Sequence, residues 1–115
     1  MDLERDGDAL LLALSALANP HRLRIIAALS QDSTHVSQLA RDLGISRPLL
    51  HMHLQRLEAA GLVQGRHEVT ADGKAIRIVE VSDFAVRLDP PTIAALAASL
   101  TKPPASGRTQ GKGDS

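Results

Sequence analysis

The segment spanning residues 37–63 constrains the fold most, because it carries the signals for two short helices joined by a tight turn. Gly44 ends the first helix, since glycine takes the left-handed C-cap conformation without a steric penalty. Ser46 is a favourable N-cap for the second helix, Pro48 suits its first turn, and Gly61 closes it. Apolar residues recur at helical spacing along both helices and predict a shared core face. They are Leu39, Ala40, Leu43, Leu50, Leu54 and Leu57.

The second helix also has residues that its core face does not use. They are Arg47, Leu49, His51, His53 and Arg56. Several of them lie on the opposite, solvent-facing side of the helix, where they could meet the base edges and phosphates of a DNA groove. The segment therefore indicates a DNA-binding function as well as a fold.

Composition and charge exclude several other kinds of site and function. The chain has 115 residues, a net charge of zero and no cysteine, which excludes disulfides and thiolate metal sites and fits a reducing cytoplasm. Its longest apolar run, residues 9–14, is far too short to cross a membrane. Residues 41–77 hold six Arg or Lys against four acids, so the non-specific affinity for DNA should be weak and salt-sensitive. We expect no enzyme, because no phosphate-binding loop or nucleophile–base pair is recognisable.

Turn signals place a further helix and a hairpin around this segment. Asn19 caps a helix that starts at Pro20 and runs to about Leu29. Two short β-branched runs are joined by residues 70–73, and the Asp72-Gly73 pair between them predicts a β-hairpin after the two-helix segment. The core residues expected around the helix that Asn19 caps are Leu17, Leu23, Ile26 and Ala27.

The domain boundaries follow from composition. We expect one folded domain over residues 8–102, preceded by a flexible N-terminus at residues 1–7. Residues 103–115 are rich in Pro, Gly, Ser and charge, which predicts a disordered tail.

The first and last helices of this domain, residues 8–18 and 91–100, are apolar almost all round. Such helices must be buried, and a domain of this size has little interior to hold two of them. A homodimer interface is the simplest solution, and burying roughly 1,500 Å² there is ordinary for a stable homodimer. The expected interface residues are Leu10, Leu11, Leu14, Ile93, Leu96 and Leu100.

With this order of elements, the chain resembles the ArsR/SmtB family of winged helix-turn-helix regulators. Residues 16–29, 38–63 and 65–81 carry the resemblance, since they are similar to that family's second-helix opening, its helix-turn-helix and its wing. The same segments overlap with MarR-like and PadR-like regulators. The resemblance implies a mainly α (α+β) fold: a winged helix-turn-helix of five helices and a two-stranded β-hairpin wing, dimerising through its first and last helices.

The resemblance further implies a cytoplasmic transcriptional regulator, a repressor or an activator, that binds a palindromic double-stranded DNA operator as a homodimer. Arg47 is the best candidate for bidentate reading of a guanine. The residues expected to approach the DNA groove are Ser46, Arg47, Leu49, His51 and His53. For His53 a second interpretation stays open, in which it packs or forms a hydrogen bond beneath the helix. The residues expected to contact the DNA backbone are Arg56, Arg66, Lys74 and Arg77.

Many members of this family release DNA when they bind a metal, but their usual ligands are missing here. His35 and Ser37 stand where thiolate sensors have a Cys-x-Cys pair, and residues 92–100 contain no Asp, Glu or His. Two alternatives stay open. One is a nickel, cobalt or zinc sensor without a cysteine site, for which His67, Glu68 and His35 are the candidate ligands. The other is a DNA-binding subunit whose effector is a small molecule or is sensed by a partner protein.

Overall fold

Every helix that the structure shows from α1 to α5 begins beside a residue whose side chain accepts a backbone N–H group. The structure is a computed structural model and describes residues 3–101. The caps and their helices are Asp6 for α1 (Gly7–Leu17), Asn19 for α2 (Pro20–Gln31), His35 for α3 (Val36–Leu43), Ser46 for α4 (Arg47–Ala59) and Asp89 for α5 (Pro90–Ala97). These side chains satisfy N–H groups that a helix start leaves without a partner.

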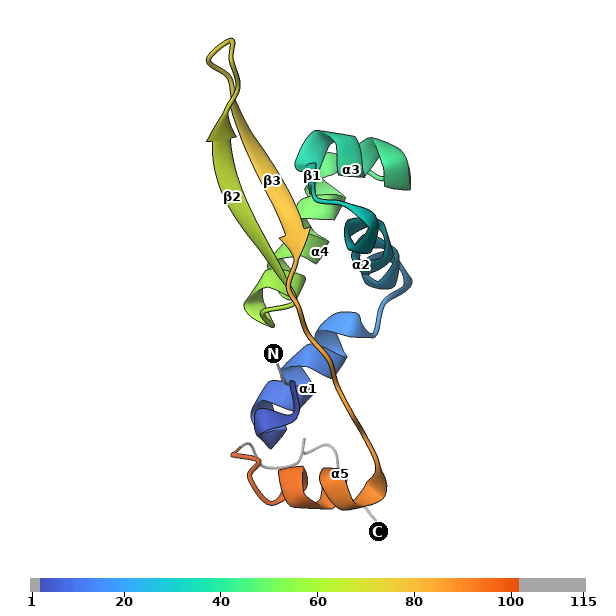
Figure 1. The fold of residues 1–115 in the computed structure, drawn as a ribbon. Helices are drawn as coiled ribbons and strands as arrows, with labels where there is room; N and C mark the ends of the chain where they lie inside the picture. The colour runs from blue at the N-terminus through green and yellow to red at the C-terminus, as the bar shows by residue number, and fades with distance from the viewer. Residues whose placement is uncertain (1–2, 102–115) are drawn as a thin grey trace.

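Three antiparallel strands form one sheet in the order β1-β3-β2: β1 (Thr34–His35), β2 (Val63–Val69) and β3 (Ala75–Val81). The strands β2 and β3 form the expected hairpin, with Gly73 at φ +85° in its turn, and the hairpin extends beyond the helices (Figure 1). The predicted two-stranded wing is confirmed, and β1, whose Thr34 pairs with Val79 of β3, adds a third strand that the sequence analysis did not predict. Two residues are too few to show the alternation that predicts a strand.

The core lies around α4. Leu50, Leu54 and Leu57 of this helix are fully buried, and they belong to one apolar cluster with Leu39 of α3 and Val79 of β3. Figure 1 shows α2, α3 and α4 gathered beside the base of the hairpin. The core face predicted for residues 37–63 is therefore confirmed.

The core face of α2 differs from the expected one. Ile25 and Leu29 are buried, whereas Leu23 is 55% exposed and Ala27 is also exposed. Apolar residues occur on most sides of this helix, so its sequence shows no single apolar stripe. Packing against α3, α4 and β3 therefore decides which side is buried.

Residues 3–7 pack with the rest of the fold, although the sequence predicted a flexible segment over residues 1–7, of which the structure describes residues 3–7. Leu3 lies in a short 3₁₀ helix, η1 (Leu3–Arg5), is only 4% exposed, and donates its N–H to the carbonyl of Ala85 at 3.2 Å. Gly7 already belongs to α1. The tail expected at residues 103–115 lies outside the described residues. Within residues 3–101, no helix has the length and apolar character needed to cross a bilayer.

Candidate DNA-binding surface

The turn between α3 and α4 sets the direction of α4. Gly44 has φ +66°, and the N–H of Ile45 donates to the carbonyl of Ala40 at 3.2 Å, which closes the end of α3. A side chain at Gly44 would meet no atom within 4 Å, so glycine is needed here for its backbone conformation alone. Ser46 then starts α4 by accepting the N–H of Leu49 at 3.2 Å.

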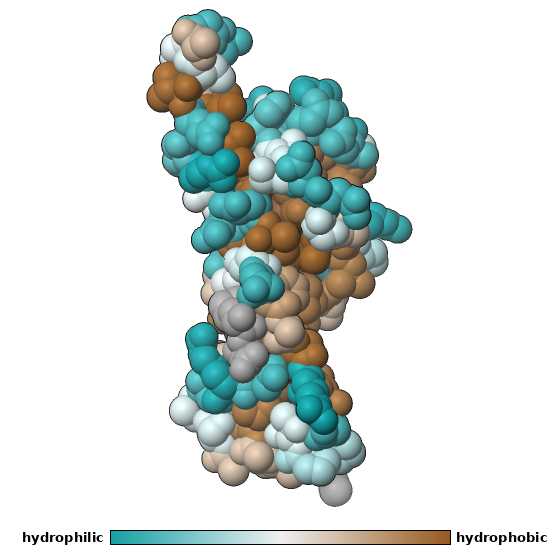
Figure 2. Space-filling model, viewed as in Figure 1, coloured by the Kyte–Doolittle hydropathy of each residue, from teal (hydrophilic) through white to brown (hydrophobic). Residues whose placement is uncertain are grey.

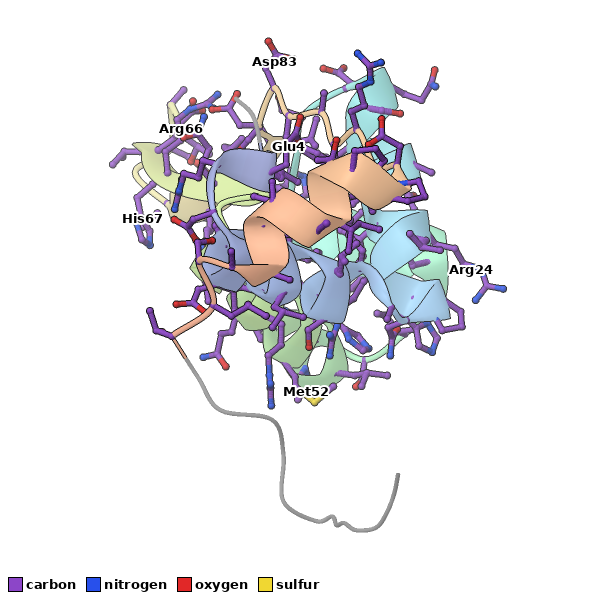
Figure 3. The ribbon with its side chains drawn as sticks, turned by 90° about the horizontal axis from the view of Figure 1, so that it is seen from below. Glu4, Arg24, Met52, Arg66, His67 and Asp83 are labelled. Atoms are coloured by element: carbon purple, nitrogen blue, oxygen red, sulfur yellow. The ribbon has the colours of Figure 1, made fainter. Side chains whose placement is uncertain are left out.

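The outer side of α4 points away from the core. Arg47, Met52, Gln55 and Arg56 are exposed on it and His51 is half-buried; Met52 projects into solvent in Figure 3. Gln55 was missed from the sequence, although it follows Arg47 and His51 at a spacing of four residues and therefore lies on the same side of the helix. A glutamine amide can pair with the major-groove edge of adenine.

Ser46 and Leu49, which were also expected to contact DNA, are less available for this contact than Arg47. The Ser46 side chain is exposed, but its oxygen already caps α4, which leaves its hydroxyl hydrogen for a phosphate. Leu49 is half-buried. Both residues lie at the start of α4, beside Arg47, because Ser46 is its N-cap and Leu49 is in its first turn.

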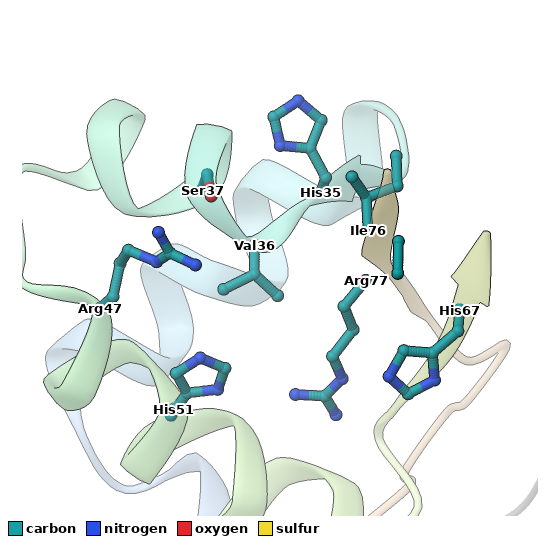
Figure 4. A pocket seen from close by; sticks show the side chains of 9 residues that line it. His35, Val36, Ser37, Arg47, His51, His67, Ile76 and Arg77 are labelled. Atoms are coloured by element: carbon teal, nitrogen blue, oxygen red, sulfur yellow. The ribbon is translucent and has the colours of Figure 1, made fainter. Parts of the chain in front are cut away.

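A hollow of about 260 Å³ separates the starts of α3 and α4 from the hairpin. Arg47 and His51 of α4 face Arg77 and His67 of the hairpin across it (Figure 4). The other lining residues are His35, Val36, Ser37, Ala75 and Ile76, so no carboxylate lines the hollow. Among the basic groups here, Arg47 and His51 of α4 suit contact with phosphate oxygens, because no carboxylate lines the hollow beside them.

Arg77 ties the hairpin to α4. Its guanidinium forms an ion pair and hydrogen bond with the carboxylate of Glu58, and both side chains are only about a quarter exposed (25% and 28%). Gly65 makes room for this pair, since a Cβ there would lie 3.0 Å from two guanidinium nitrogens of Arg77. The structure thus gives Arg77 a role in orienting the wing, because its charge is already paired with Glu58.

The remaining basic residues of the expected backbone contacts differ in their pairing. Arg66 donates to Glu68 and to Glu80, at 3.0 Å in each case, which offsets its charge on the exposed face of the hairpin. Lys74, beside the hairpin turn, and Arg56, on α4, are exposed, and among residues 3–101 neither forms an ion pair. Lys74 and Arg56 are therefore better placed for phosphate contact than Arg66.

The expectation that His53 reads DNA is wrong, because this side chain is only 2% exposed. It lies three residues after Leu50 and four before Leu57, so it belongs to the buried side of α4. Its Nδ1 accepts a hydrogen bond from Nε of Arg22 at 3.1 Å, and its ring centre lies 5.3 Å from that of His21. Burial above all, and then the nearby Arg22 and His21, lower the pKa of His53.

This lowered pKa predicts that stability falls in mild acid. In the unfolded chain a histidine takes up a proton at about pH 6.5, whereas His53 in the folded chain takes up its proton only at a lower pH. The contribution of His53 to the free energy of unfolding should therefore be complete above about pH 6.5 and decline as the pH falls toward the folded pKa. Urea titrations from about pH 7.5 to 5.5 should show a larger loss for the wild type than for His53→Leu. Equal losses in the two proteins would contradict this assignment.

The three candidate metal ligands do not converge. The imidazole Nδ1 of His35 accepts the N–H of Gln38 at 3.2 Å, and Glu68 is paired with Arg66. His67 and Glu68 are neighbours on a strand, so their side chains point to opposite faces of the sheet. Over residues 3–101, no group of three or more His, Asp or Glu side chains is arranged to hold a metal ion. Within residues 3–101 of one chain, His35, His67 and Glu68 therefore do not come together as the metal site that the sequence left open as an alternative.

A second, apolar hollow of about 180 Å³ lies between α1 and α5, which cross in Figure 3. Leu11 is 52% exposed and Ile93 is 48% exposed, and no residue of α5 is buried. In Figure 2, hydrophobic residues reach the surface where α1 runs toward α5, whereas hydrophilic residues predominate over α3. The hollow is lined by all six residues expected at the dimer interface, namely Leu10, Leu11, Leu14, Ile93, Leu96 and Leu100.

Fold and site together define a winged helix-turn-helix protein with an exposed recognition helix. Residues 19–64 match the family model described as bacterial regulatory protein, arsR family. A stretch of 75 residues is 35% identical to an uncharacterized HTH-type transcriptional regulator of Methanocaldococcus jannaschii, covering 64% of this chain and 77% of that protein. The chain therefore belongs to the ArsR family of transcriptional regulators, and its DNA-binding element is a winged helix-turn-helix.

Two further relatives support this assignment. Nodulation protein NolR of Rhizobium meliloti is 40% identical over 67 residues, which cover 56% of this chain and 55% of that protein. The solution structure of a homodimeric winged helix-turn-helix DNA-binding domain from Mycobacterium bovis, described as a possible ArsR-family regulator, matches with a TM-score of 0.59 and 25% identity. That match covers 79% of this chain and 74% of the other. None of these relatives is described as an enzyme: the Methanocaldococcus jannaschii protein is described as a transcriptional regulator and the Mycobacterium bovis domain as a possible one.

Proposed function

We propose that this protein is a homodimeric, sequence-specific transcriptional regulator that reads a palindromic operator with α4. The observation that carries the proposal is the row formed by Arg47, His51 and Gln55 on the outer side of α4, beside a hollow without a carboxylate lining. Arginine and glutamine are side chains that read guanine and adenine in the major groove. Arg56 and Lys74 would contact phosphates on either side, and the protein would act in the cytoplasm, where its operator lies.

The homodimer is the second part of the proposal. The apolar hollow between α1 and α5 leaves leucine and isoleucine side chains exposed, and a second copy of the chain would bury them. The relative from Mycobacterium bovis is described as a homodimer. A two-fold axis at this face would present two copies of α4 to successive major grooves, about 34 Å apart, and so require a palindromic operator.

Replacing Arg47 with alanine tests the reading role. The test duplex is one that the wild type selects from a random pool. We expect the affinity of Arg47→Ala for this duplex to be about tenfold to a hundredfold lower than that of the wild type, because a bidentate contact to guanine is worth about 1–3 kcal/mol. The affinity for an unrelated duplex should fall much less. Fluorescence anisotropy at fixed salt measures both affinities.

Arg87→Ala is the matched control, because Arg87 is an exposed arginine in the segment joining β3 to α5. In Figure 1 this segment runs away from the hairpin turn. It should bind both duplexes as the wild type does. An equal loss on both duplexes in Arg47→Ala would assign Arg47 to the phosphates and remove it as a reader. A wild type that selects no sequence from the pool would overturn the proposed function itself.

A further inference from the structure

Arg22 lies where three helices meet. This α2 residue donates from Nε to Nδ1 of the buried His53 of α4, at 3.1 Å. Its Nη1 lies 3.5 Å from the carbonyl oxygen of Ser15 and 3.4 Å from that of Ala16, near the C-terminal end of α1. One guanidinium therefore contacts the helix of the apolar dimer face and the helix of the DNA-binding surface.

The chemistry of both partners fits this arrangement. The last carbonyls of a helix carry partial negative charge and attract a cation, so Arg22 is well placed at the end of α1. The planar fork of an arginine directs Nε and Nη1 along fixed, different lines, which lysine cannot reproduce. Nδ1 of His53 can accept only when it carries no proton, so the ring is neutral and its hydrogen is on Nε2.

The far side of the same ring gives a second, independent observation. The Nε2 atom of His53 is buried and has no hydrogen-bond partner within the described part of the chain. A buried donor without a partner destabilises the fold, so a leucine of similar volume would suit this core position better. Stability alone therefore does not explain a histidine at this position, whereas the bond to Arg22 does.

We propose that Arg22 is a positioning residue that, together with His53, fixes the recognition helix α4 on the dimer helix α1. The inference rests on the proposed function, because it needs a DNA-binding α4 and a dimer face on α1. A shift of α1 at the dimer interface would then move Arg22 and reorient α4, so that Arg22 couples the dimer interface to DNA affinity.

A pair of variants at position 53 separates positioning from stability. His53→Leu fills the volume and removes the acceptor, while His53→Asn keeps an oxygen that can accept from Arg22 close to the place of Nδ1. At pH 7.5, we expect His53→Leu to unfold at no lower urea concentration than the wild type. It should nevertheless lose about tenfold in affinity for the selected duplex, whereas His53→Asn should keep most of that affinity. Equal affinities for the two variants, or a loss of affinity that tracks the loss of stability, would overturn the proposal.

A double-mutant cycle tests the coupling itself. Leu11→Ala trims an exposed residue of the dimer face, and Arg22→Lys keeps the charge but loses the fork. Affinities for the selected duplex are measured for both single variants and the double variant, at concentrations where sedimentation shows dimers. We expect the loss caused by Leu11→Ala to be at least about threefold smaller in the Arg22→Lys background than in the wild type. Additive losses would overturn the proposal, whereas a failure of the proposed function would already appear as a wild type that binds no selected duplex.

Discussion

Gly7→Ala is expected to displace α5 from α1 and to weaken the homodimer by about tenfold to a hundredfold, the equivalent of an overpacking penalty of about 1–3 kcal/mol. A Cβ at Gly7 would overlap the carbonyl oxygen of Leu96 and lie 2.8 and 2.9 Å from side-chain carbons of Leu100. Because the first obstacle is backbone, it cannot rotate away. Sedimentation equilibrium over a range of concentrations measures the dissociation constant.

Helix propensity alone predicts that Gly7→Ala stabilises the protein, so the two explanations predict opposite results. Alanine in place of glycine stabilises a helix interior by up to about 1 kcal/mol, and at Gly7, the first residue of α1, we expect a smaller gain of the same sign. A variant that dimerises as tightly as the wild type, with a higher melting temperature, would contradict the close contact between α1 and α5. Adding Leu100→Ala should not restore the dimer, because the obstruction by the Leu96 carbonyl would remain.

Hydrogen bonds around Gly7 also hold α1 against the end of α5. The N–H of Gly7 donates to the hydroxyl of Ser99 at 2.8 Å, and the carboxylate of Asp8 accepts from the N–H of Thr101 at 3.2 Å and from its hydroxyl. These bonds join the first turn of α1 to the end of α5. The two helices therefore present one continuous apolar face, which is the feature that the proposed dimer needs.

Local rules predicted the helix-turn-helix because each signal there acts within a few residues. Gly44 ends α3 in the left-handed conformation, Ser46 caps α4, and Leu50 is fully buried, all as expected. Of the two interpretations that the sequence allowed for His53, the one beneath the helix is confirmed, because His53 follows Leu50 by three residues, precedes Leu57 by four and is buried. A histidine is compatible with either surface or core, so only the position of Arg22 shows how its ring is used.

Pairing between distant residues could not be read from the sequence. Arg77 was expected to be free for the DNA backbone, but Glu58 lies beside it once the hairpin folds onto α4. Arg66 is likewise paired across the hairpin with Glu80. Such pairs depend on the register of β2 against β3 and on the angle of the hairpin, which residue spacing does not determine.

Leu54→Ala is expected to lower the free energy of unfolding by about 2–5 kcal/mol, a large part of the roughly 5–15 kcal/mol that stabilises an ordinary domain. Leu54 is fully buried in α4, so the substitution loses apolar contact and leaves a cavity. The matched control is Leu23→Ala in α2: the same atoms are removed, but Leu23 is 55% exposed, so the change should stay within about 0.5 kcal/mol. Urea unfolding at one protein concentration compares the two variants. The sequence pattern predicted that both leucines lie in the core. Similar losses in the free energy of unfolding for the two variants would support that prediction. A much larger loss for Leu54→Ala would show that packing, and not the sequence pattern, decides which side of α2 is buried.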